Sequence, residues 1–313
     1  MKILITEPQD YSPKAIEIYK SLGEVVLGGE PTVDTEIVVV RLKYKIDKSW
    51  MDKMPNLKII ASPTTGLNHI DIVEAEKRGI KIISLRGHTD FLDKITSTAE
   101  ETLGLILALV RKIPQAYEHV KAGGWDRDQF KGYQLAGQTL GILGLGRLGK
   151  MVARYGKAMD MKVIAADPHI DAATMMRYGV EKVSMEELFK QSDVISLHVL
   201  LTDDTKNLVK ENHLKTMKPT AYLVNTARAE IVEIGALEMA LKNKWIAGAA
   251  VDVMWDEDGS GAHLPKSELW QMTKSGQYNL IVVPHIGGAT YDAMQITEEF
   301  IADLVKKHFN TNY

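Results

Sequence analysis

The feature that most constrains the fold is a glycine-rich segment, GLGRLG, between a predicted strand and a predicted helix. Residues Thr139–Leu143 form an apolar run typical of a buried strand, and the GLGRLG segment follows at once. The pattern of Arg147–Met161 is helical, and a second apolar run, Lys162–Ala166, ends at Asp167. A strand, a helix and a strand in this order predict a βαβ unit, and such a unit requires parallel strands.

Each part of this unit has a physical role in a dinucleotide site. Gly144 permits a tight turn, Gly146 lets the main chain approach a pyrophosphate, and Gly149 lets the helix pack close to the strand. The helix N-terminus offers N–H groups and the positive end of its dipole to that anion. Asp167 would accept hydrogen bonds from the adenosine ribose and repel a 2′-phosphate, which predicts NAD rather than NADP. An ordinary glycine-rich turn is the alternative, but the strand, helix and acid agree with one another.

The same alternation of strand and helix patterns continues along the whole chain and predicts an α/β fold. Further strands are predicted at Lys2–Thr6, Ile37–Arg41, Lys58–Ala61, Lys81–Leu85, Val194–Leu197, Ala221–Asn225, Ala247–Asp252 and Leu280–Pro284. Further helices are predicted at Lys14–Leu22, Ile95–Lys112, Met185–Lys190, Gly235–Lys242 and Asp292–Phe309. The helix at Ile95–Lys112, with Thr96 or Ser97 as its cap and Pro114 beyond its end, precedes a polar connector and separates two units.

Composition limits the class of protein. The chain has 313 residues, enough for about two domains. It carries 38 basic and 41 acidic side chains, and this near balance argues against a nucleic-acid partner. The absence of cysteine excludes disulfides, a cysteine nucleophile and thiolate metal sites, and we expect no metal. No apolar run is long enough to span a membrane and the first residues do not form a signal-peptide pattern, so the expected location is the cytoplasm.

Three later segments place polar side chains where predicted strands end. Arg228 follows AYLVNT, Asp252 and Glu257 lie in AAVDVMWDE, and His285 ends LIVVPH. Arginine can grip a carboxylate and polarise the adjacent carbonyl, and histidine can exchange a proton with the resulting oxygen. Glu257 would favour the imidazolium and fix its tautomer. Each residue alone is as typical of a structural role, but together, after the glycine motif, they predict hydride transfer between a nicotinamide and a 2-hydroxy acid.

The order GLGRLG, Asp167, NTAR, DV, Glu257 and PHIGG resembles the D-isomer-specific 2-hydroxyacid dehydrogenase family. The segments STAEETLGLILAL, GLNHID, GWDR and HVLLT agree with it too. The resemblance implies two Rossmann-like domains, built on doubly wound parallel sheets, with an active-site cleft between them. Residues 1–94, completed by about 288–313, would form the substrate domain, and residues 95–287 the NAD-binding domain. Arg228, Glu257 and His285 fall on the catalytic arginine, acid and histidine of the family.

The resemblance also implies binding residues and a partner. Besides the motif glycines and Asp167, the cofactor would contact Thr65, Arg147, Leu148, Val199, Thr226, Ala227, Asp252 and Gly288, with Asp252 on the nicotinamide carboxamide. The substrate, a small 2-hydroxy or 2-keto acid, would contact Arg41, Thr64, Thr65, Gly66 and Arg228. The family is typically a homodimer through the cofactor domain, and the apolar helix near residues 97–112 would contact the partner subunit.

Several positions depart from the family pattern or leave alternatives open. Ala229 replaces the usual glycine and would be strained if its φ were positive; Leu200 replaces a proline. The inserted residues 258–280 form either a surface loop with a short helix or a flap carrying His263, Trp270 or Tyr278 to a ligand.

The substrate itself is left open. Arg41 matches an arginine of 3-phosphoglycerate dehydrogenases, but Ser62 replaces their second one. Lys43, Lys45, Arg86 and His88 either make the cleft cationic or are simply solvated. An NADH-binding corepressor-like assembly protein and a phosphite-type dehydrogenase are the alternative functions.

Overall fold

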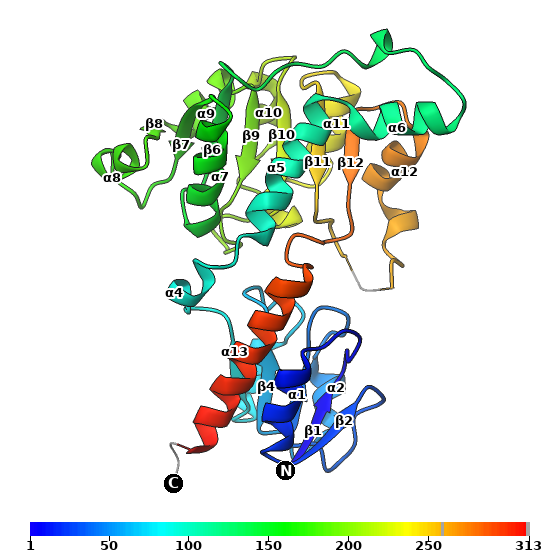
Figure 1. Ribbon diagram of the computed structural model, residues 1–313, viewed down its shortest axis with the longest axis vertical. Helices are drawn as coiled ribbons and strands as arrows, with labels where there is room; N and C mark the ends of the chain where they lie inside the picture. The colour runs from blue at the N-terminus through cyan, green and yellow to red at the C-terminus, as the bar shows by residue number, and fades with distance from the viewer. Residues whose placement is uncertain (258–259, 311–313) are drawn as a thin grey trace. The chain divides into compact units, whose positions relative to one another are not determined.

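The structure, a computed structural model, describes residues 1–257 and 260–310, which form two compact units (Figure 1). Unit 1 consists mainly of Met1–Ile95 and the segment that begins at Ala289. Unit 2 consists of Thr96–Glu257 and Ala262–Gly288. Each unit is built on a parallel sheet, so the predicted α/β fold with two doubly wound sheets is confirmed.

Unit 1 contains a five-stranded parallel sheet in the order β2-β1-β3-β4-β5. Its strands are β1 (Lys2–Ile5), β2 (Glu24–Leu27), β3 (Ile37–Val39), β4 (Ile59–Ser62) and β5 (Lys81–Ser84). Its helices are α1 (Pro13–Lys20), α2 (Lys48–Asp52), α3 (Ile72–Lys77), α4 (Thr89–Leu92) and α13 (Tyr291–Asn310). The edge strand β2 was not predicted.

Strand alternation distributes the apolar residues of unit 1 between two cores. Ile3 and Ile5 of β1 point to the face covered by α1 and α13, whereas Leu4 points to the opposite face, where Met51 of α2 is buried. Helix α13 packs along α1, as Figure 1 shows. The last long helix therefore completes the sheet that the first residues begin.

Unit 2 contains a seven-stranded parallel sheet in the order β12-β11-β10-β9-β6-β7-β8. Its strands are β6 (Thr139–Leu143), β7 (Lys162–Ala166), β8 (Glu181–Lys182), β9 (Val194–Leu197), β10 (Tyr222–Asn225), β11 (Gly248–Val251) and β12 (Leu280–Val282). Its helices are α5 (Ser97–Val110), α6 (Ile113–Lys121), α7 (Arg147–Ala158), α8 (Ala172–Arg177), α9 (Met185–Gln191), α10 (Glu211–Thr216), α11 (Ala236–Lys242) and α12 (Glu268–Ser275). Short 3₁₀ turns lie at Asp128–Phe130, Ala229–Ile231 and Leu264–Lys266. The strand order reverses between β6 and β9, and ligands of such sheets bind beyond the strand ends at this point.

The long helical pattern near residue 100 forms two helices. Helix α5 ends at Val110, Lys112 adopts a left-handed φ of 51°, and α6 begins with Pro114 in its first turn. Proline fits a first turn because its missing N–H has no partner there. Thr96 occupies the N-cap position of α5, as predicted, but its side chain makes no capping hydrogen bond to the main chain; its hydroxyl donates to Glu100 instead.

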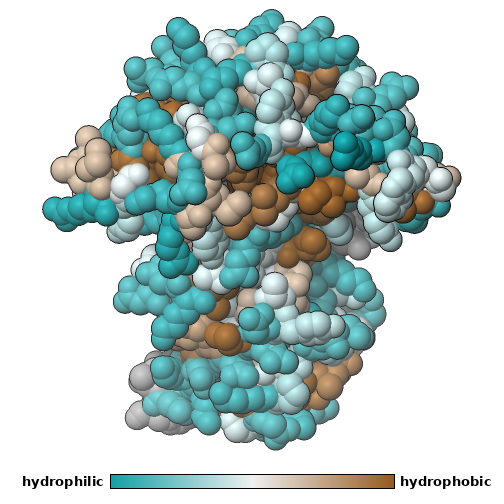
Figure 2. Space-filling model, turned by 45° about the horizontal axis from the view of Figure 1, so that its top comes forward, coloured by the Kyte–Doolittle hydropathy of each residue, from teal (hydrophilic) through white to brown (hydrophobic). Residues whose placement is uncertain are grey.

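The apolar side chains of these two helices have different environments. Leu105, Ile106, Leu109 and Val110 of α5 are buried in the core of unit 2 itself, so most of their apolar surface is not available to a partner subunit. Helix α6 has no buried residue. Figure 2 shows hydrophobic residues breaking the hydrophilic exterior of unit 2 in several places. Exposed apolar side chains on and after α6 are Ile113, Tyr117, Val120 and Trp125.

The described part of the insertion, residues 260–280, contains a 3₁₀ turn and α12. Leu269 and Met272 of α12 are buried, and Trp270 and Tyr278 pack partly buried against the same core. This arrangement fits a surface segment with a short helix; residues 258 and 259 lie outside the described part of the chain. Across residues 1–257 and 260–310, none of the helices combines the length and the apolar character that crossing a bilayer requires.

Candidate active site

The glycine-rich segment forms the tight connection between β6 and α7. Gly144 has a φ of +90°, and a Cβ there would lie 2.8 Å from Cγ1 of Val199. A Cβ on Gly149 would lie 2.2 Å from the carbonyl oxygen of Gly144, so only glycine lets α7 approach the loop this closely. Beside Gly146, in contrast, a Cβ would have no atom within 4 Å. The loop is therefore closely packed on one side and open at Gly146, the residue just before α7.

Asp167 lies against this loop at the end of β7. Its Oδ2 accepts a hydrogen bond of 2.9 Å from the N–H of Leu145, and its Oδ1 accepts one of 2.9 Å from the N–H of His169. Gly146 is the N-cap residue of α7. Because it has no side chain, it cannot accept a hydrogen bond from the first N–H groups of the helix. The arrangement fits NAD. The open side of Gly146 and the start of the twelve-residue helix α7 suit the pyrophosphate, and Asp167 suits the ribose.

The predicted acid and histidine form a direct pair. Nδ1 of His285, which follows β12, lies 2.6 Å from Oε1 of Glu257. The side chains are 26% and 33% exposed, so a small molecule can reach them. Burial alone would raise the pKa of Glu257, but the hydrogen bond and the charge of His285 outweigh it and lower that pKa below its ordinary value. Glu257 is thus a carboxylate at neutral pH, as its predicted role requires.

Arg228 is held by a turn that Asn225 closes. The side chain of Asn225 accepts from the N–H of Ala227 at 3.0 Å and donates to the carbonyl of Arg228 at 2.9 Å. Nη1 of Arg228 donates to the carbonyl of Ala227 at 2.6 Å, and its charge contributes to the low pKa of Glu257. Ala229 begins a 3₁₀ turn without a positive φ, so alanine carries no left-handed strain here.

Asp252 fixes the turn that carries His285. His285 has a φ of 54°, which is unusual for a residue with a side chain. Oδ1 of Asp252 accepts from the N–H of Ile286 at 2.6 Å, and Oδ2 accepts from the N–H of Gly287 at 2.9 Å. The contact predicted for Asp252 was with the nicotinamide. Its second role, holding the main chain beside the histidine, was not predicted.

Two residues of α5 reach the same region, and neither was predicted. The hydroxyl of Thr102 lies 2.8 Å from that of Thr226, inside the unit. The carboxyl group of Glu101 lies near that of Asp252: a Cβ built on Gly287 would lie 2.6 Å from Oε2 of Glu101 and 3.0 Å from Oδ2 of Asp252. The available signal in the sequence was the acidic residue Glu101 directly before the apolar run TLGLILALV. Its contact with a residue so distant in the chain can be recognised only from the folded structure.

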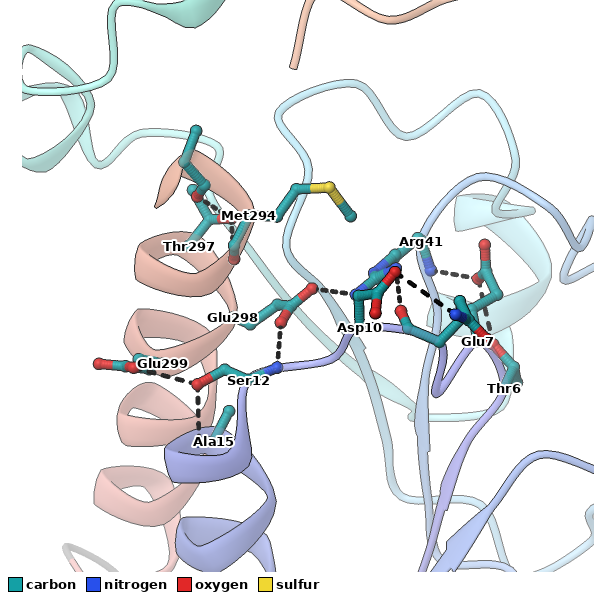
Figure 3. Close-up of polar contacts among 12 residues, drawn as sticks. Thr6, Glu7, Asp10, Ser12, Ala15, Arg41, Met294, Thr297, Glu298 and Glu299 are labelled. Atoms are coloured by element: carbon teal, nitrogen blue, oxygen red, sulfur yellow. Dashed lines mark hydrogen bonds and ion pairs between the residues drawn. The ribbon is translucent and has the colours of Figure 1, made fainter. Parts of the chain in front are cut away.

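Arg41 of unit 1 is engaged with its own unit (Figure 3). Nη2 forms an ion pair with Glu298 of α13, Nη1 donates to the carbonyl of Gln9 at 3.1 Å, and the guanidinium lies 5.1 Å from the ring centre of Tyr11. The side chain of Glu298 is 1% exposed. The charge of Arg41 is therefore balanced inside the unit, which does not favour the predicted role in substrate binding.

The other predicted residues have these positions. Thr64 donates its hydroxyl to the carbonyl of Gly66 at 2.8 Å, which keeps the 62–66 loop compact. A Cβ on Gly288 would have no atom within 4 Å, and Leu200 is 80% exposed. His88 packs edge-on against Phe300 with ring centres 5.0 Å apart. The ligand contacts assigned to Thr64, Thr65, Gly66, Arg147, Leu148, Val199, Thr226, Ala227 and Gly288 stay predictions.

Comparison with known proteins relates this arrangement to one family. Residues 103–287 match the model of the NAD-binding domain of the D-isomer specific 2-hydroxyacid dehydrogenases. The chain is 38% identical to glyoxylate reductase of Thermococcus litoralis over 281 residues, covering 87% of this chain and 80% of the relative. It is 35% identical to D-3-phosphoglycerate dehydrogenase of Methanocaldococcus jannaschii over 316 residues. That match covers 98% of this chain but only 57% of the relative, so the chain spans little more than half of that protein.

A solved structure agrees with these matches. The crystal structure of D-lactate dehydrogenase from Aquifex aeolicus, complexed with NAD and lactic acid, superposes with a TM-score of 0.84. The two chains are 29% identical, and the superposition covers 99% of this chain and 96% of that one.

Proposed function

The chain belongs to the D-isomer specific 2-hydroxyacid dehydrogenase family, an NAD-dependent enzyme family, and from this premise we propose that it interconverts a 2-keto acid and the D-2-hydroxy acid. The predicted family and the predicted cofactor, NAD, are confirmed by the same matches. The observation that carries the proposal is the 2.6 Å pair of His285 and Glu257, with Arg228 close enough for its charge to act on Glu257.

In the proposed reaction Arg228 binds the substrate carboxylate and polarises the adjacent carbonyl. His285 holds the proton that goes to the carbonyl oxygen, and Glu257 stabilises the protonated imidazole. NADH, when bound, supplies the hydride to the carbonyl carbon. Reversing the two transfers oxidises the hydroxy acid.

We propose that unit 2 holds NAD at the Gly144–Gly149 loop. The open side of Gly146 and the start of α7 would accept the pyrophosphate, and Asp167 the adenosine ribose. The carboxylate of Asp167 would repel the 2′-phosphate of NADP. Unit 1 would then be the substrate domain, as the sequence predicts.

We further propose that the substrate lacks a phosphate group. A phosphorylated acid needs a second cationic contact, but the guanidinium of Arg41 is paired with Glu298 and residue 62 is a serine. Glyoxylate or another short 2-keto acid fits this charge distribution better than a phosphorylated acid does. The name of the Thermococcus litoralis relative, glyoxylate reductase, is consistent with that choice.

A homodimer is the proposed assembly, with the contact surface moved from α5 to α6. The apolar side chains of α5 are largely buried within unit 2, whereas those of α6 are exposed. Tyr117 is 63% exposed and Trp125 90% exposed. Exposed aromatic side chains of this kind favour burial in an interface between subunits.

The function is tested by following NADH oxidation with glyoxylate, pyruvate, hydroxypyruvate and phosphohydroxypyruvate, using His285→Ala as the control. We expect reduction of at least one unphosphorylated acid by the parent protein and a loss of about 10²-fold or more in the variant. Activity confined to phosphohydroxypyruvate would contradict the substrate class. Absence of NADH oxidation with every acid, together with tight NADH binding, would favour a binding protein over an enzyme.

A further inference from the structure

Glu101 and Asp252 place two carboxyl groups together in the interior of unit 2. A Cβ built on Gly287 would lie 2.6 Å from Oε2 of Glu101 and 3.0 Å from Oδ2 of Asp252, so both groups face the same residue. Asp252 is 1% exposed, and both carboxyl oxygens of Glu101 are shielded from solvent. Within residues 1–257 and 260–310, neither carboxyl oxygen of Glu101 has an N–H or hydroxyl partner, and, besides burial, Asp252 is the charged group that raises its pKa.

Two buried carboxylates so close together cannot both be ionised without strong repulsion, so one of them keeps a proton. Asp252 already accepts the N–H groups of Ile286 and Gly287, and these bonds favour its charged form. Burial raises the pKa of Asp252 as well, but the two N–H bonds and the charge of His285 oppose that shift. Glu101 has no such compensation, so we assign the proton to Glu101. Burial first, and then the charge and hydrogen bond of Asp252, raise the pKa of Glu101 to about 8.

Resting on the function proposed above, we propose that Glu101 is a positioning residue that, as a neutral acid, donates its O–H to Asp252 and so holds the turn that carries His285. The chain of contacts runs from α5 through Asp252 to the two N–H groups that follow the histidine. In this proposal Glu101 acts on the reaction through Asp252 and the turn that carries His285.

The turn needs such support because His285 has a left-handed φ of 54°. A residue with a side chain keeps this conformation only where the surroundings impose it. When Glu101 loses its proton, the hydrogen bond to Asp252 is replaced by repulsion between two carboxylates. Asp252 then holds Ile286 and Gly287 less firmly, and the imidazole is less well placed for proton transfer.

The charged groups around the pair are few. Asp252, after β11, is the charged group that acts on Glu101, and the charge of His285, after β12, acts on Asp252. One step further away, His285 and Arg228 act on Glu257 and lower its pKa. On α5 itself, Glu100 is exposed and accepts a hydrogen bond from Thr96. The proposal therefore assigns the loss of a proton near pH 8 in this cluster to Glu101.

The experiment compares Glu101→Gln, which keeps a hydrogen-bond donor but cannot ionise, with Glu101→Leu, which removes the donor. Glu100→Gln and Glu100→Leu are the matched controls on the exposed side of α5. At pH 7 we expect the Gln variant to keep kcat close to that of the parent. The Leu variant should lose about tenfold or more, as expected for losing a hydrogen bond to a charged group. Above about pH 8 the parent should lose activity that Glu101→Gln retains.

A second measurement does not depend on activity. Because the folded-state pKa of Glu101 is raised from 4.5 to about 8, its stabilising contribution is full below about pH 4.5 and is lost as pH rises toward 8. The melting temperature of the parent should therefore fall relative to Glu101→Gln across this window, and Glu100→Gln should follow the parent.

The two readouts separate the two proposals. If the parent protein reduces no keto acid, the proposed function is refuted. The pH dependence of the melting temperature would still test whether Glu101 is protonated. Parallel melting curves for parent and Glu101→Gln would overturn the assignment of the proton. Normal turnover in Glu101→Leu, or identical pH profiles for parent and Glu101→Gln, would overturn the positioning role.

Discussion

Nδ1 of His285 lies 2.6 Å from Oε1 of Glu257, although 28 positions separate them in the chain. One residue follows β12 and the other follows β11, so the neighbouring ends of two parallel strands bring them together. Since Glu257 occupies Nδ1, we expect Nε2 to exchange the proton with the substrate. The pair is partly exposed, which leaves that nitrogen accessible.

Replacing Glu257 by Gln should shift the pH dependence of keto-acid reduction. The lowered pKa of Glu257 keeps it negative throughout the neutral range, where its charge stabilises the protonated imidazole. Without that charge the protonated imidazole lacks its stabilising partner, so the rate of reduction should fall at lower pH than in the parent. Rates measured between pH 5 and 9 at saturating NADH test this, and an unshifted profile would contradict the role proposed for Glu257.

Arg228→Lys should lower kcat/KM by about 10²-fold or more. Lysine keeps the positive charge but loses the planar fork that binds a carboxylate through two hydrogen bonds. The matched control is Arg127→Lys, because the side chain of Arg127 is 95% exposed. Steady-state kinetics with the best keto acid measure the effect. Equal losses in both variants, or none in Arg228→Lys, would speak against the catalytic assignment.

Asp167→Ala should narrow the preference for NADH over NADPH. In the parent we expect NADH to bind at least about tenfold more tightly, because the carboxylate bonds to a ribose hydroxyl and repels the 2′-phosphate. Fluorescence titration with both cofactors measures the ratio, and Asp303→Ala, on an exposed position of α13, is the control. Equal affinities in the parent protein would contradict the role of Asp167.

Glu298→Ala should destabilise unit 1 far more than Glu299→Ala does. The first substitution leaves Arg41, only 16% exposed, without its buried partner and deprives the N–H of Ser12 of its acceptor; the expected cost is about 3 kcal/mol. Glu299 pairs with Lys14, which is 71% exposed, so its loss should cost less than about 1 kcal/mol. Urea unfolding gives both values; similar losses would mean that the Arg41–Glu298 pair contributes little.

Tyr117→Lys combined with Val120→Glu should convert the proposed dimer to a monomer. Both side chains lie on α6 and are at least half exposed within the chain, so charges there oppose burial against a second subunit without disturbing the core. Met176→Lys, at a 63% exposed position of α8, is the control. Light scattering after size exclusion reports the mass. A parent protein that is already monomeric would refute the assembly.

Most strands of the fold could be predicted from the sequence, because buried parallel strands consist of continuous apolar runs. All ten predicted strands exist. The two that were missed, β2 and β8, are partly exposed edge strands and lack that pattern. Helix α6 was missed because Pro114 was taken to follow a helix end, whereas it lies in the first turn of the next helix.

The site was predictable only where a residue type and its local motif carry the chemistry. Arg228, Glu257 and His285 were identified as a candidate trio because each lies beyond a predicted strand and falls on a motif of the family. Glu101 has no such motif, and only the packing of α5 beside β11 brings it to Asp252. For Arg41 the sequence was misleading. Its match to a family arginine suggested a contact with the substrate, but in the structure its guanidinium forms an ion pair with Glu298.

The packing of α13 along α1 also orders the events of biosynthesis. A ribosome completes every residue of unit 2 before it reaches Tyr291, so unit 2 can collapse on its own while the sheet of unit 1 still lacks one covering helix. Until α13 is present, the face of α1 that carries Ala15 and Tyr19 would be exposed to solvent. In the finished protein these side chains are buried beside Ile301 and Val305 of α13. Nascent chains stalled before α13 should therefore show protease resistance in unit 2 and sensitivity in the N-terminal segment, with protection appearing only once α13 has emerged.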